Sequence, residues 1–124
     1  MKRVVYAHRG GLDAIKIIDE GNPTPKVDQM RIEVHRAGIN FADLMMRQGL
    51  YGAAPDFPFT PGYEISGIVS ELGSGITDFS VGDRVVALSG FGGYAEQVVV
   101  DSNRVWPLPD NVSFDAAAAM PVTY

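Results

Sequence analysis

The sequence predicts a mostly β domain, of the kind that forms a barrel or a sandwich. Short β-rich segments recur along its 124 residues, and 14 glycines and 8 prolines separate them, which is typical of many short strands joined by turns. A chain of this length can bury a core of its own. The hydrophobic content of 46% and the charged content of 20% exclude a disordered chain.

The first segments are expected to form a pair of strands. Residues 3–7 (RVVYA) and 14–18 (AIKII) are β-rich, and two glycines separate them. Residues 23–28 contain two prolines and little apolar content, so they are interpreted as a surface connection. Apolar and polar residues then alternate over 30–35, which predicts a strand with one buried face.

A helical pattern follows over residues 40–49. Phe41, Leu44 and Met45 fall on one face of this helix, which is therefore expected to be its apolar face. The proline-containing loop 51–62 comes next. Long segments without regular structure tend to be functional in compact domains, so this loop is interpreted as the wall of a cleft.

The second half of the chain is predicted to be β and to end in a helix. The expected strands are 65–72, 84–88, 94–100 and 105–108. Ser113 is placed to cap a helix that begins FDAAAAM. Because this helical pattern starts close to the last residue, we expect the chain to be one piece of a longer protein.

The composition excludes several functions. The absence of cysteine excludes disulfides, thiolate metal sites and a cysteine nucleophile, and His8 and His35 are too far apart in the sequence to suggest a metal site. The net charge of −5 has the wrong sign for a nucleic-acid surface. No apolar run approaches the roughly 18 residues that span a bilayer, and no signal-peptide core follows the first residues. A cytoplasmic location is therefore expected.

Four polar residues and one glycine-rich stretch are candidates for special roles. Asn40 and Asp43 form an N-x-x-D pattern that resembles a capping box. Asp43 and Arg47 are four residues apart, which favours an ion pair on the helix surface. Glu64 is expected to be half-buried and to pair with a cation or with backbone N–H groups. Residues 90–93 (GFGG) are expected to form a hairpin turn, since no strand-to-helix G-x-G-x-x-G pattern occurs.

Three stretches together resemble the zinc-independent branch of the medium-chain dehydrogenase/reductase superfamily. They are AGINFADLMMRQGLY (37–51), TPGYEISGIVSELGSGITDFSVGDRVVAL (60–88) and GGYAEQVVV (92–100). Within that branch they are similar to NADPH-dependent quinone oxidoreductases, including the zeta-crystallin type, and to the synaptic-vesicle amine-transport protein homologues. The resemblance implies that residues 1–124 are a GroES-like catalytic domain, a partly open β-barrel with short helices. A Rossmann domain for the dinucleotide is then expected after Tyr124.

The positions that hold zinc and relay protons in the zinc alcohol dehydrogenases are changed in this chain. By the resemblance, Asn40 stands in place of the first zinc cysteine and Tyr63 in place of a histidine ligand. Ala42 and Met45 replace the two residues of the proton relay. The resemblance therefore implies a reductase without zinc.

The resemblance also implies where a substrate and a cofactor meet. Asn40 and Tyr51 correspond to family positions beside the nicotinamide, and the implied reaction is hydride transfer from NADPH to a quinone or an enone. The implied pocket residues are Asn40, Tyr51, Met45 and Tyr63, with Asp43, Arg47 and Glu64 as structural residues nearby.

A second hypothesis is a non-catalytic homologue that acts as a membrane-associated, binding or structural protein. The resemblance is compatible with peripheral membrane contact but does not indicate it. It further implies a homodimer for the longer protein, and no catalysis by residues 1–124 alone, because nothing in them resembles a pyrophosphate site.

Overall fold

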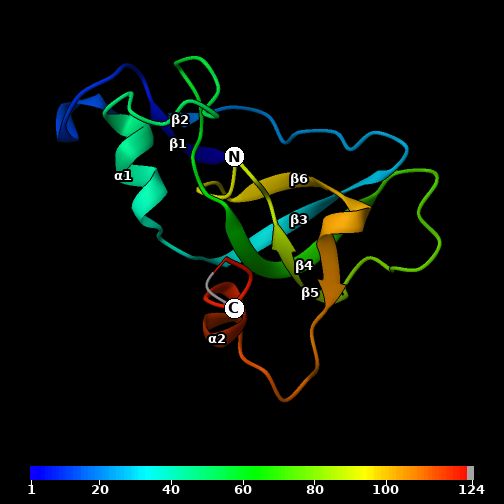
Figure 1. The fold of residues 1–124 in the computed structure, drawn as a ribbon. Coiled ribbons are helices and arrows are strands. Elements are labelled where there is room, and N and C mark those ends of the chain that lie inside the picture. The colour runs from blue at the N-terminus through cyan, green and yellow to red at the C-terminus, as the bar shows by residue number, and fades with distance from the viewer. Residues whose placement is uncertain (123–124) are drawn as a thin grey trace.

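The computed structural model describes residues 1–122 and shows a mostly β fold with two short helices (Figure 1). The helices are α1 (Phe41–Arg47) and α2 (Phe114–Ala118), and single 3₁₀ turns occur at Leu12–Ala14 and Ser102–Arg104. The strands are β1 (Lys2–Tyr6), β2 (Ile15–Asp19), β3 (Gln29–Ala37), β4 (Glu64–Leu72), β5 (Arg84–Leu88), β6 (Gln97–Asp101) and β7 (Val105–Pro107).

The strands form two antiparallel sheets that do not close on themselves. The pair β1–β2 was expected from the sequence and is confirmed, with Tyr6 opposite Ile15. The other five strands form one sheet in the order β6-β3-β4-β5-β7. Isolated bridges connect Arg3 with Ala95 and Tyr6 with Phe59, so the small sheet lies against two loops of the large one. This open arrangement confirms the predicted partly open barrel with short helices.

The main core lies on one face of the five-stranded sheet. Alternate residues of β3, β5 and β6 are buried, as the alternation over residues 30–35 predicts for β3. Each fully buried aliphatic side chain contributes about 1.5–3 kcal/mol relative to an exposed one. The cluster consists of Met30, Ile32, Ile65, Val69, Phe79, Val85, Ala87, Val98, Val100 and Val105.

Helix α1 packs on a second, smaller cluster, and its buried face differs from the predicted one. Met46 is buried there with Tyr6 and Phe59, whereas Phe41 and Leu44 are 74% and 42% exposed. The prediction of the apolar face was therefore wrong. The helix has only seven residues, and the two that it buries are Met46 and Asp43, the latter through polar contacts described below.

Helix α2 is held against the sheet by polar and aromatic contacts. Its predicted cap is confirmed, because the Ser113 hydroxyl accepts from the Ala116 N–H at 3.1 Å. The Ser66 hydroxyl on β4 donates to the Phe114 carbonyl at 2.6 Å. The Arg84 guanidinium on β5 lies 4.6 Å from the centre of the Phe114 ring. These contacts fix the segment that follows α2 near the start of β4.

The glycine-rich stretch 90–93 is not a hairpin turn, so this prediction was wrong. Strands β5 and β6, which it connects, are separated by β3 and β4 in the sheet. The glycines instead permit a close crossing with loop 51–62. A Cβ on Gly62 would lie 2.7 Å from the Gly93 Cα atom, and the Gly93 N–H donates to the Gly62 carbonyl at 3.1 Å.

Candidate functional site

The candidate site lies where β3 ends and α1 begins. Because β3 and β4 are antiparallel, with Ala37 opposite Ile65, the residues after β3 lie beside Glu64, the first residue of β4. Asn40 is the N-cap of α1. Its side-chain Nδ2 donates to Glu64 Oε1 at 3.1 Å, across 24 residues of sequence.

Glu64 is buried more deeply than the sequence predicts. It is 2% exposed rather than half-buried, because it enters the space over Gly38. Of the two predicted kinds of partner, a cation or N–H groups, the structure shows N–H groups. Its second oxygen, Oε2, accepts from the backbone N–H of Val122 at 3.0 Å. Among residues 1–122 no cation lies within ion-pair distance of this carboxylate.

Asp43 is the second buried carboxylate of the site and is 3% exposed. It completes the predicted capping box by accepting from the Asn40 backbone N–H at 2.9 Å. The same oxygen accepts from the Tyr94 hydroxyl, which also lies 3.0 Å from the Gly38 carbonyl. Burial raises the pKa of the Tyr94 phenol above its ordinary value, and the bond to Asp43 raises it further.

The predicted ion pair between Asp43 and Arg47 is absent from the described residues, so that prediction was wrong. The donors of Asn40 and Tyr94 both reach Asp43 Oδ2, while Asp43 Oδ1 and Arg47 Nε have no hydrogen-bond partner within residues 1–122. Arg47 makes no salt bridge in the same range. The Arg47 carbonyl instead accepts from the Gly10 N–H at 2.9 Å, which joins the end of α1 to the loop after β1.

Two of the remaining pocket residues, Tyr51 and Tyr63, form an aromatic group with Phe91. The Tyr51 and Tyr63 rings meet edge to face with centroids 6.5 Å apart, and Tyr63 lies 5.5 Å from Phe91. Tyr51 is 37% exposed, so the residue is partly open to solvent. Burial raises the pKa of Tyr63, and the neighbouring Tyr51 hydroxyl raises it further. Met45 is half-buried on α1.

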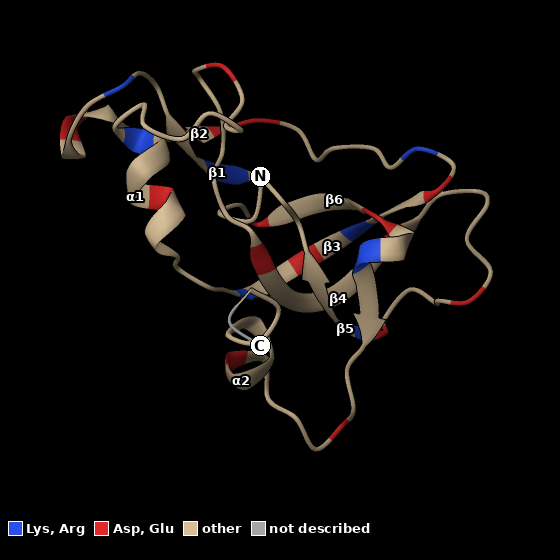
Figure 2. Ribbon diagram, viewed as in Figure 1, with Lys and Arg blue, Asp and Glu red and all other residues tan. Residues whose placement is uncertain are grey.

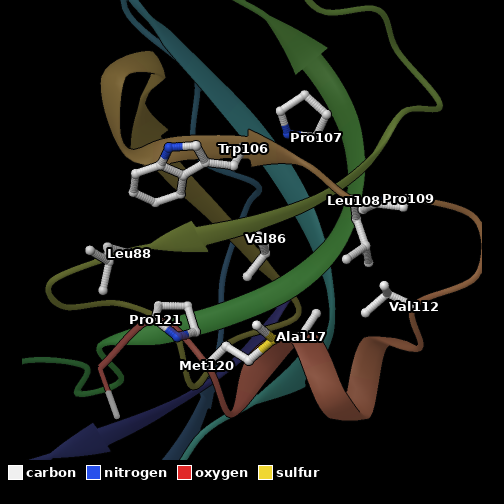
Figure 3. A pocket seen from close by; sticks show the side chains of 10 residues that line it. All are labelled: Val86, Leu88, Trp106, Pro107, Leu108, Pro109, Val112, Ala117, Met120 and Pro121. Atoms are coloured by element: carbon white, nitrogen blue, oxygen red, sulfur yellow. The ribbon is translucent and has the colours of Figure 1, made fainter. Parts of the chain in front are cut away.

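A cavity of about 460 Å³, which sequence reasoning missed, lies between β5, β7 and α2 (Figure 3). The expected proline-lined cleft was assigned to loop 51–62, but the prolines that line this cavity belong to β7 and to the segments around α2. The cavity joins residues that are far apart in sequence, so no local pattern identifies it. Its lining is Val86, Leu88, Trp106, Pro107, Leu108, Pro109, Val112, Ala117, Met120 and Pro121.

In the described part of the chain, Lys and Arg are spread over several elements and no group of side chains could hold a metal ion. Figure 2 shows Lys and Arg on separate segments of the ribbon rather than gathered on one element. Within residues 1–122 no three His, Asp or Glu side chains come together in a way that could hold a metal ion. No helix in the same range is long and apolar enough to cross a membrane.

An open antiparallel sheet, with a short helix inserted between β3 and β4 and a polar network at the start of that helix, defines a domain of the GroES-like class. Residues 26–110 match the model of the alcohol dehydrogenase GroES-like domain, and the chain belongs to this family. The GroES-like domain implied by the resemblance is thereby confirmed.

The curated relatives include both reductase-like and vesicle-membrane proteins. The chain is 42% identical to the synaptic vesicle membrane protein VAT-1 homolog of Danio rerio, over 99% of this chain and 26% of the relative. It is 44% identical to quinone oxidoreductase-like protein 2 of Bos taurus, over 87% of this chain and 31% of the relative. The chain thus spans between a quarter and a third of the length of these relatives.

Solved structures show the same fold. The human VAT-1 homolog-like protein aligns with a TM-score of 0.94 at 40% identity, over 98% of this chain and 38% of the other. The Escherichia coli quinone oxidoreductase complexed with NADPH aligns with a TM-score of 0.91 at 33% identity, over 97% and 37%. These relatives identify the chain as a domain of an oxidoreductase family.

Proposed function

We propose that the chain is the catalytic domain of an NADPH-dependent, zinc-independent quinone or enone oxidoreductase. The observation that carries the proposal is the fixed position of Asn40, which Glu64 and Asp43 hold by the side chain and the backbone respectively. A rigid amide at the start of α1, together with a partly exposed tyrosine just beyond its end, Tyr51, would be suited to binding a carbonyl compound without a metal ion. The similarity to a quinone oxidoreductase solved with NADPH supports the same assignment.

The residues present fit one part of the cofactor. The amide of Asn40 and the phenol of Tyr51 offer polar groups to a nicotinamide, and the rings of Tyr63 and Phe91 offer apolar contact. The chain has no glycine-rich strand-to-helix turn for a pyrophosphate. The proposal therefore includes a separate dinucleotide-binding domain in a longer protein, with residues 1–124 as its GroES-like catalytic domain.

NADPH, when bound, supplies the hydride, and the protein supplies orientation and charge stabilisation. Asn40 and Tyr51 donate hydrogen bonds that orient the reacting carbonyl and stabilise the negative charge that develops on its oxygen. No residue of the site has to act as a strong base. The longer protein is proposed to be a cytoplasmic homodimer that takes a small quinone or enone as substrate.

A second function is favoured by one specific finding. Vesicle membrane proteins are among the most similar relatives, so a non-catalytic, membrane-associated role is the competing proposal. The two are separated by measuring NADPH oxidation by the longer protein with 1,4-benzoquinone and with a simple enone. Turnover that falls in Tyr51→Phe, but not in the control Leu12→Ala at a highly exposed position, supports the reductase. Wild-type protein that oxidises no NADPH with any acceptor contradicts it.

A further inference from the structure

Glu64 is a buried carboxylate whose partners among residues 1–122 are all N–H donors. Its two oxygens accept separately from Asn40 Nδ2 and from the Val122 N–H. Burying a carboxylate without a cation is costly unless hydrogen bonds satisfy it. A side chain that only accepts hydrogen bonds is required here, because a donor faces each of its oxygens.

The fold provides a specific place for this side chain. The absence of a Cβ on Gly38 leaves the space that Oε1, Cδ and Cγ of Glu64 occupy. The Gly38 N–H donates to the Glu64 backbone carbonyl at 3.0 Å. Hydrogen bonds therefore hold Glu64 both by its backbone carbonyl and by its two side-chain oxygens.

The orientation of the Asn40 amide follows from this placement. With Nδ2 turned to Glu64, the amide oxygen lies on the side of the Asp43 backbone N–H, in the capping box. An amide has two N–H donors, and Glu64 takes one of them. No residue within 1–122 accepts from the other N–H of Asn40, so this donor is available to a ligand. The backbone of Asn40 is fixed in turn by Asp43, which Tyr94 holds.

We propose that Glu64 is a positioning residue that sets the orientation of the Asn40 amide, so that Asn40 presents a single N–H donor to a carbonyl oxygen of the ligand. The inference rests on the proposed function and deepens it. Two carbonyl groups have this chemistry in the proposed reaction: the oxygen of the quinone or enone, and the carboxamide of the nicotinamide.

Exchanging the carboxylate of Glu64 and the amide of Asn40 tests this role. The exchange preserves the hydrogen bond between the two side chains and the bond to Val122, but it removes the N–H donor at position 40. In the double variant Asn40→Asp/Glu64→Gln, the new amide donates to the new carboxylate, and the oxygen of that amide still accepts from Val122. The carboxylate at position 40 still caps α1. No N–H remains at position 40 for a ligand. The single variant Asn40→Asp instead places two carboxylates about 3 Å apart, which costs stability at neutral pH.

The first arm uses residues 1–124 and is independent of catalysis. At pH 7 we expect Asn40→Asp to lower the melting temperature by about 5 °C or more, and the added Glu64→Gln to restore most of the loss. Glu71→Gln, a more exposed position on the same strand, is the matched control and should not rescue Asn40→Asp.

In wild type, NMR should show one Asn40 side-chain N–H protected from hydrogen exchange, and Glu64→Ala should remove the protection. An Asn40→Asp variant as stable as wild type, or protection that survives Glu64→Ala, overturns the positioning role.

The second arm uses the longer protein. We expect the exchanged double variant to be folded but to lose about a hundredfold in kcat/KM for the quinone if the N–H serves the substrate. If the N–H serves the nicotinamide, the same variant weakens NADPH binding measured by fluorescence, and the loss in kcat/KM disappears at saturating NADPH. A double variant with wild-type turnover and wild-type NADPH binding overturns the donor role. Wild-type protein without turnover contradicts the proposed function, while the first arm still decides the positioning role.

Discussion

The carboxylate of Glu64 occupies the space that a side chain on Gly38 would fill. A Cβ built on Gly38 would overlap with three atoms of the Glu64 side chain. The backbone of Gly38 has no positive φ, so its conformation does not require glycine. Glycine is required here because the Glu64 side chain approaches it closely. The pair connects the turn after β3 with the first residue of β4 and determines where Asn40 begins α1.

Replacing Gly38 with alanine should destabilise the domain by about 1–3 kcal/mol, because the new methyl group displaces Glu64 from its buried hydrogen bonds. Urea unfolding measures the change. Gly21→Ala is the matched control, since a Cβ there would meet nothing within 4 Å, and it should leave the free energy of unfolding nearly unchanged. Equal stability of the two variants would show that the Glu64 side chain does not lie over Gly38.

Stability should fall at alkaline pH because of Tyr94. Its pKa in the folded state lies above the ordinary value of 10.0, so the folded protein holds this proton more tightly than the unfolded chain does. The resulting stabilisation is complete below about pH 10 and is lost as the pH rises from there. Urea unfolding from pH 8 to 11 should show a shallower alkaline decline in Tyr94→Phe than in wild type. Identical slopes would contradict the assignment.

Two arginines at α2 should differ in their effects on stability. Arg84 donates to the carbonyls of Pro109 and Val112 at 2.8 and 2.7 Å and covers the Phe114 ring, so Arg84→Ala should cost about 2 kcal/mol. Arg36 makes an exposed ion pair with Asp115, so Arg36→Ala should cost less than about 1 kcal/mol. Thermal unfolding compares them, and a larger loss for Arg36→Ala would contradict the described docking of α2.

The chain is expected to bind no zinc beyond adventitious amounts. It has no cysteine, and within residues 1–122 no group of three His, Asp or Glu side chains comes together that could hold a metal ion. Elemental analysis after dialysis should give well under one zinc per chain. Stoichiometric zinc that survives dialysis would show that a metal site exists.

The strands were predictable because each has its own local pattern. Alternating or apolar runs bounded by glycine and proline located them to within a few residues, although β6 begins at Gln97 rather than at 94. The cap of α2 at Ser113 was predictable for the same reason. The buried face of α1 was not predictable, because Asp43 is buried in a hydrogen bond with Tyr94, which lies 51 residues away in the sequence.

The site was predictable only in part. Asn40, Tyr51 and Tyr63 were identified through the family resemblance, and their roles stay predictions. The contact between Asn40 and Glu64 depends on the register of β3 against β4, which shifts between Val34 and Arg36. A shift of this kind leaves no pattern in the sequence.

The cavity was not predictable from the sequence either. It brings together β5, β7 and the segments around α2, which only the folded sheet places side by side. No local run of residues marks its lining.

Hydride transfer from NADPH to a carbonyl acceptor is the role that we propose for this domain. Its most direct test is the rate of NADPH oxidation with 1,4-benzoquinone by the longer protein, compared between wild type and Tyr51→Phe at equal melting temperature. The account predicts turnover in wild type, a clear fall in Tyr51→Phe because a phenol donor is lost, and no turnover by residues 1–124 alone. Wild-type protein without turnover, or Tyr51→Phe and wild type with the same rate, would contradict it.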